Sequence, residues 1–202
     1  MSSRINEGSS KVLLVKVVML GDPAVGKTSL VQRFVLDSFG GRYKRTMGLD
    51  LSIKEVTLPQ ATISIQLRDM GGQISFKPLR LRFYNGTRGA MLVYDATRPS
   101  TFDNLEIWLQ ELENNVITEV PFVVLGNKSD LGELCVISEE EETSWATKVK
   151  ALSSFRTSAK TGGNVEKAFH SLGEKIVADI LKIDRIPQIA AEQVWDEHLT
   201  FE

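Results

Sequence analysis

The chain has 202 residues, of which 42% are hydrophobic and 25% are charged, with 24 Lys and Arg against 26 Asp and Glu. These are ordinary globular values, and a chain of this length buries a substantial core without disulfides. The balanced charge excludes a strongly basic protein that grips nucleic acid through many phosphates. The single cysteine, Cys135, excludes an intramolecular disulfide. No apolar run is long enough to span a membrane, so we expect a soluble, cytoplasmic protein.

The first half of the chain predicts a strand, then a helix, then two further strands. A small, polar lead at 1–10 precedes a continuous β-branched run at 11–20, which is typical of a strand buried on both faces. Apolar residues then recur at helical spacing over 28–36. The segments 49–58 and 61–69 alternate with a period of two, which predicts an antiparallel hairpin.

The second half alternates strands and helices more regularly. Strands are predicted at 89–95, 121–126 and 153–157, and helices at 99–115, 138–149 and 164–182. Ser138 and Glu141 form a capping box at the start of the second of these helices. The pattern predicts a mostly parallel, six-stranded α/β sheet with one antiparallel edge strand and helices on both faces. We expect one domain at 11–182, followed by a tail at 183–202.

A glycine-containing loop, GDPAVGKT from Gly21 to Thr28, joins the first strand to the first helix. We call it the phosphate loop, because it matches G-x-x-x-x-G-K-[ST] in the required strand–loop–helix context. Its amides would bind phosphate oxygens, Lys27 would reach the β- and γ-phosphates, and the Thr28 hydroxyl would ligand Mg²⁺. The alternative is an ordinary βα turn, but a chance match is on the order of one in a hundred. The predicted phosphate-contacting residues are Asp22, Pro23, Ala24, Val25, Gly26, Lys27, Thr28 and Ser29.

Two further motifs indicate the base. NKSD from Asn127 to Asp130 and SAK from Ser158 to Lys160 each follow a predicted parallel strand, so they lie on the same rim as the phosphate loop. The Asp130 carboxylate can accept hydrogen bonds from guanine N1–H and the 2-amino group, whereas adenine offers neither donor. The Lys128 stem can cover one face of the base, and the Ala159 amide can donate to guanine O6. The predicted base-contacting residues are Asn127, Lys128, Asp130, Ser158, Ala159 and Lys160.

From about Lys11 to Lys182 the sequence resembles the Ras-like small GTPases, and the Rab branch most closely. The resemblance is carried by the phosphate loop, YKRTMGLD around Thr46, DMGGQ at 69–73, LVYDAT at 92–97, GNKSDL at 126–131 and TSAKTGGNVEKAF at 157–169. It implies the three-layer P-loop NTPase fold. It also implies a molecular switch that binds GTP or GDP with Mg²⁺ and hydrolyses GTP slowly.

The resemblance gives roles to two polar segments. The first switch is 37–47, where Phe39 would lie against the base, Tyr43 over the phosphates, and Thr46 on the Mg²⁺. The second switch is 69–86. In it, Asp69 would hold Mg²⁺ through water and the Gly72 backbone amide would sense the γ-phosphate. Gln73 would orient the attacking water. The predicted metal ligands are Thr28, Thr46 and Asp69. Effectors, exchange factors and GTPase-activating proteins would bind through both switches.

The second switch and the C-terminus depart from the usual Rab pattern. Gly71-Gly72-Gln73 resembles the Arf and Gα pattern, and Ile74 replaces the usual acidic residue. The chain ends EHLTFE without a cysteine, so no lipid anchor is visible, and three interpretations stay open: a source lineage without prenyl anchors, recruitment to membranes by a partner, or a missing natural tail. We expect a monomer. A non-switching GTP-binding scaffold is the main alternative. A nucleotide kinase is a weaker one, since no acceptor-binding lid is evident.

Overall fold

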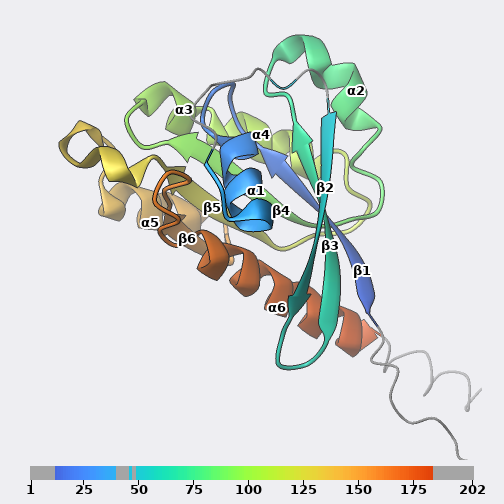
Figure 1. The fold of residues 1–202 in the computed structure, drawn as a ribbon. Helices are drawn as coiled ribbons and strands as arrows, with labels where there is room; N and C mark the ends of the chain where they lie inside the picture. Colours follow the sequence, from blue (N-terminus) through green and yellow to red (C-terminus); the bar gives the residue numbers. More distant parts are fainter. Residues whose placement is uncertain (1–11, 40–45, 47–48, 184–202) are drawn as a thin grey trace, which may run out of the picture.

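The computed structural model describes residues 12–39, 46 and 49–183 (Figure 1). One sheet of six strands has the order β2-β3-β1-β4-β5-β6. Only the β2–β3 edge pair is antiparallel, and the other four pairs are parallel. The predicted fold class is therefore confirmed. The predicted lead at 1–10 and the tail from 184 onwards lie outside the described residues.

The strands follow the predicted segments to within two residues at each end. They are β1 (Leu13–Leu20), β2 (Leu49–Thr57), β3 (Thr62–Met70), β4 (Thr87–Asp95), β5 (Phe122–Asn127) and β6 (Ser153–Arg156). In β1, Val15, Val17 and Met19 face one hydrophobic cluster, while Val18 and Leu20 face the other. This alternation explains the continuous apolar run, because both faces of a central parallel strand are covered.

Helices cover both faces of the sheet (Figure 1). Their bounds are α1 (Lys27–Leu36), α2 (Lys77–Leu81), α3 (Pro99–Asp103), α4 (Leu105–Glu113), α5 (Glu139–Lys148) and α6 (Val165–Ile183). α1 and α6 bury apolar residues in one cluster, where Phe34 stacks on Phe169 with ring centroids 3.8 Å apart. α4 and α5 pack on the opposite cluster. The predicted capping box of Ser138 and Glu141 is present at the start of α5. No helix in the described ranges is long and apolar enough to cross a membrane.

Two features differ from the helical pattern of the sequence. The helix expected at 99–115 is divided at Asn104 into α3 and α4. The Asn104 side chain reaches from this junction to the phosphate loop, where its Nδ2 donates to Asp22 Oδ2 at 2.8 Å. The second switch also contains the short helix α2, for which the sequence shows no period. Five residues are too few for periodicity to be informative, and α2 is held mainly by its tertiary contacts.

Candidate functional site

The phosphate loop has a backbone that requires glycine at its centre. Gly26 has a φ of 102°, and a Cβ there would lie 2.2 Å from Asn127 Nδ2. That nitrogen instead donates to the carbonyl of the buried Val25 at 2.9 Å. The contact fastens the phosphate loop to the end of β5. The motif that follows β5 therefore shapes the phosphate-binding backbone as well as the base site.

Lys27 is almost completely buried and folds back over the phosphate loop. Its Nζ donates to the Gly21 carbonyl at 2.6 Å and to the Asp22 carbonyl at 2.8 Å. Burial lowers the pKa of Lys27 to about 8, because the charged ammonium loses solvation that the nearby Asp69 and Asp22 only partly replace. A phosphate group at this point would supply the missing counter-charge.

The Asp22 side chain points away from the phosphates, toward α4. Its Oδ1 accepts a hydrogen bond from Trp108 Nε1 at 2.8 Å, and its Oδ2 accepts the bond from Asn104 described above. One bond comes from α4 and the other from the residue that caps its start, so this part of the chain fixes the start of the loop. The carboxylate of Asp22 is therefore an anchor for the loop, which leaves only its backbone for the predicted phosphate contact.

The base-binding motifs lie together at the ends of β5 and β6. Ser158 Oγ donates to Asp130 Oδ1 at 2.6 Å, and Lys160 Nζ lies 3.9 Å from Asp130 Oδ2. The Ala159 amide, which we expect to reach guanine O6, donates to Asn127 Oδ1 at 3.2 Å. Asp130 is thus held by Ser158 with its carboxylate facing the site.

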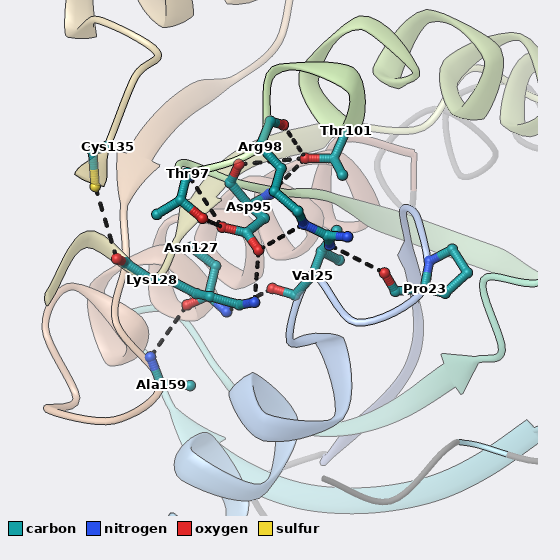
Figure 2. A network of polar contacts seen from close by, with 10 residues as sticks. All are labelled: Pro23, Val25, Asp95, Thr97, Arg98, Thr101, Asn127, Lys128, Cys135 and Ala159. Atoms are coloured by element: carbon teal, nitrogen blue, oxygen red, sulfur yellow. Dashed lines mark hydrogen bonds and ion pairs between the residues drawn. The ribbon is translucent and has the colours of Figure 1, made fainter. Parts of the chain in front are cut away.

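Asp95, at the end of β4, joins the base motif to the phosphate loop (Figure 2). Its Oδ2 pairs with Lys128 Nζ at 2.6 Å and with Arg98 Nε at 2.9 Å. Arg98 Nη2 in turn donates to the Pro23 carbonyl at 3.2 Å. Burial alone would raise the pKa of Asp95, but hydrogen bonds from Lys128 and Thr97 outweigh it and hold the pKa below its usual value. We call Asp95, Lys128 and Arg98 the rim cluster.

The three predicted metal ligands meet beneath the phosphate loop. Thr28 Oγ1 donates to Asp69 Oδ2 and lies 2.8 Å from Thr46 Oγ1. Asp69 Oδ1 is buried and has no hydrogen-bond partner among the described residues, and burial raises the pKa of this carboxyl. Two hydroxyls and an unpartnered carboxylate oxygen match the oxygen ligands that Mg²⁺ prefers. The described residues contain no group of three or more His, Cys, Asp or Glu that could hold a metal ion.

A cavity of about 700 Å³ connects these parts. Most of the predicted site residues line it, namely Pro23, Ala24, Gly26, Lys27, Thr28, Ser29, Phe39, Thr46, Gly72, Gln73, Asn127, Lys128, Asp130, Ala159 and Lys160. Gln32, Met70, Gly71 and Leu131 also line it and are not among the predicted residues. Asp22, Val25, Ser158 and Asp69 support the lining from behind through the contacts given above. The predicted contact of Tyr43 lies outside the described residues.

Sequence reasoning missed the residues that support this lining from a distance. Asp95 is the last residue of β4, and a polar residue at the carboxyl end of a strand is a signal that could have identified it. Arg98 and Trp108 carry no local signal. Their partners are 75 and 86 residues away in the chain.

Comparison with known proteins agrees with this geometry. The Ras family model matches residues 16–178. The chain is 35% identical to the Ras-related protein RABA2a of Arabidopsis thaliana over 89% of its length and 81% of the relative. It is 37% identical to Rab-7a of Dictyostelium discoideum over 84% of its length and 85% of that relative. It is 41% identical to RABA6b of Arabidopsis thaliana over 82% of its length and 76% of that relative. With its phosphate loop, base-binding motifs and sheet, the chain belongs to the Ras family as a Rab-like small GTPase, a regulatory switch that binds guanine nucleotide and hydrolyses GTP.

Proposed function

We propose that the cavity binds Mg²⁺ with GTP or GDP through the residues predicted from sequence, and that Gln73 orients the water that attacks the γ-phosphate. The observation that supports this most directly is the convergence of three separate motifs on one cavity. The phosphate loop, the base motifs, and Thr28 and Thr46 beside the buried Asp69 all line it. Nothing in the described ranges favours a non-switching scaffold.

Each part has a distinct task in the proposed reaction. The amides of the phosphate loop and the Lys27 ammonium hold the β- and γ-phosphates, and Asp130 selects guanine. Thr28, Thr46 and Asp69 would hold Mg²⁺, which when bound neutralises charge on the phosphate oxygens. Gln73 lines the same cavity and supplies an amide for the water. Catalysis then depends on positioning, so the intrinsic rate should be slow.

We also propose that effectors, exchange factors and GTPase-activating proteins bind along 37–47 and 69–86. Exposed apolar side chains lie within the second of these segments and on β2, which follows the first. They are Leu51 and Ile53 on β2 and Leu79 and Leu81 on α2. Apolar side chains on this face give a partner something to bury beyond the polar switch backbone. We further propose that the protein acts in the cytoplasm and that a partner supplies any attachment to membranes.

The replacement Gln73→Leu tests the assigned chemistry. It removes the amide that would orient the water, so hydrolysis of bound GTP in a single turnover should fall by roughly tenfold to a hundredfold. The affinities for GTP and GDP should change little, because no predicted base or metal contact is lost. Gln110→Leu is the matched control, since it makes the same change at an exposed position of α4. If Gln73→Leu hydrolyses GTP at the wild-type rate, Gln73 has no such role.

A further inference from the structure

The second switch contains an arginine that is buried more deeply than an ordinary surface charge. Arg80 on α2 is 3% exposed. Its Nε and Nη2 pair with the two carboxylate oxygens of Glu111 on α4, at 2.8 and 3.0 Å. Tyr84 Oη donates to the same carboxylate at 2.9 Å. One edge of the Arg80 guanidinium is therefore held by both oxygens of Glu111, and Tyr84 in turn orients that carboxylate.

The remaining nitrogen of Arg80 is directed at the backbone around the predicted catalytic residue. Its Nη1 donates to the Gln73 carbonyl at 2.8 Å and to the Gly71 carbonyl at 3.1 Å. These two carbonyls flank Gly72. The Gly71 carbonyl belongs to the same peptide group as the Gly72 amide that is proposed to sense the γ-phosphate, and the Gln73 carbonyl belongs to the peptide group that follows Gln73, so one side chain fixes both.

The backbone at this point packs tightly against the phosphate loop. A Cβ on Gly72 would lie 2.5 Å from the Gly21 carbonyl oxygen and 2.7 Å from Pro23 N. The Arg80 guanidinium also lies over the Trp108 ring, 4.7 Å from its centroid, and Trp108 anchors Asp22 of the phosphate loop. The same face of α4 therefore holds the phosphate loop and the Gln73 backbone in one arrangement.

The stability of the fold does not by itself explain why an arginine and a glutamate occupy positions 80 and 111. Replacing a buried ion pair with apolar residues of similar volume is often neutral or stabilising, because the ion pair loses solvation. An apolar pair between α2 and α4 would hold the helices together equally well. It would lack N–H donors for the two carbonyls beside Gly72, and these donors are what the arginine adds.

We propose that Arg80 is a positioning residue for GTP hydrolysis, held by Glu111, which fixes the backbone of Gly72 and Gln73 against the phosphate loop. The inference rests on the proposed role of Gln73. Arg80 touches neither nucleotide nor water in this account. It acts only by keeping Gln73 where its amide can orient the attacking water.

The test compares three variants by single-turnover GTP hydrolysis, nucleotide affinity and melting temperature. Arg80→Lys keeps the charge but cannot span a carboxylate and two carbonyls, so hydrolysis should fall by roughly tenfold with affinity nearly unchanged. The double variant Arg80→Met, Glu111→Leu removes both buried charges and leaves only the Tyr84 hydroxyl without its partner, so its melting temperature should fall modestly while hydrolysis stays slow. Tyr84→Phe is the matched control, because it removes a hydrogen bond to Glu111 and leaves the Arg80 donors in place.

A last comparison separates this inference from the proposed role of Gln73. In a Gln73→Leu background, Arg80→Lys should slow hydrolysis by less than about twofold, because residues that act through one another are not additive. The inference is overturned if the double variant hydrolyses GTP at the wild-type rate, or if Tyr84→Phe is as slow as Arg80→Lys. It is also overturned if Arg80→Lys is unimpaired while Gln73→Leu is slow. A normal rate in Gln73→Leu overturns the role of Gln73 itself.

Discussion

Two ion-pair clusters border the nucleotide cavity, and they differ mainly in their contact with water. In the rim cluster, the side chains of Arg98 and Lys128 are 43% and 35% exposed while Asp95 is buried. In the pair between α2 and α4, which we call the buried clamp, Arg80 and Glu111 are 4% and 7% exposed. Each cluster uses an arginine to hold a carbonyl of a phosphate-facing segment, Pro23 in one case and Gln73 in the other.

This difference in exposure predicts that the rim cluster affects nucleotide binding and that the buried clamp affects GTP hydrolysis. The rim cluster connects the ends of β4 and β5 beside the proposed base site, and its cations are partly solvated. The buried clamp connects a five-residue helix to α4, and it cannot readjust without exposing an unpaired charge. We therefore expect changes at the rim to alter affinity, and changes at the clamp to alter stability and hydrolysis.

The largest expected effect is at the base site, in the variant Asp130→Ala. It removes the proposed acceptor of two hydrogen bonds from guanine, each involving a charged group, so affinity for GTP should fall roughly a thousandfold. The rate constant for hydrolysis of GTP that is already bound should change far less. Titration of a fluorescent GTP analogue measures the affinity, and inosine triphosphate, which lacks the 2-amino group, should lie between GTP and ATP on the wild type. Equal affinities of the wild type for GTP and ATP would contradict the assignment of the base.

The next largest effect is on the free energy of unfolding in the variant Glu111→Gln, and it depends on pH. Burial would raise the pKa of Glu111, but hydrogen bonds from Arg80 and Tyr84 outweigh it and hold the pKa below 4.5. The stabilisation by this carboxylate is therefore complete above that pH and is lost as the pH falls through the lowered value. Glu111→Gln leaves Arg80 buried without a counter-charge, so the free energy of unfolding should fall by about 3 kcal/mol at neutral pH.

Thermal unfolding between pH 3 and pH 7 checks this expectation. The difference between wild type and Glu111→Gln should shrink as the pH falls below 4.5, the unshifted value for this group. Glu113→Gln is the control, because Glu113 is an exposed residue of the same helix. A difference that stays constant across the range would mean that the clamp does not depend on the charge of Glu111.

The smallest expected effect is at the rim cluster, in the variant Asp95→Asn. Lys128 and Arg98 would lose their counter-charge but keep contact with water, so GDP release should accelerate by only about tenfold. Asp179→Asn, in the α6 pair with Lys175, gives the background for losing a surface carboxylate. A large drop in melting temperature for Asp95→Asn, with unchanged GDP release, would erase the distinction between the two clusters.

The sequence predicted the parts of the site whose signal is local. Gly26, Lys27 and Asp130 belong to short motifs that follow strands, and the resulting fold places them around one cavity. The buried clamp could not be predicted, because Arg80 and Glu111 are 31 residues apart and neither belongs to a periodic or motif pattern. The division of the 99–115 helix at Asn104 could not be predicted either, because Asn104 bonds to Asp22, which is 82 residues away.

Trp108 gives the molecule an internal optical probe. Its indole N–H is bonded to the phosphate loop and its ring lies under the guanidinium of the second switch. Indole emission depends on hydrogen bonding and on nearby charge, so one native side chain senses both segments. With Trp145 and Trp195 replaced, the chain would carry a single tryptophan, and its fluorescence would follow nucleotide exchange and hydrolysis without an added label.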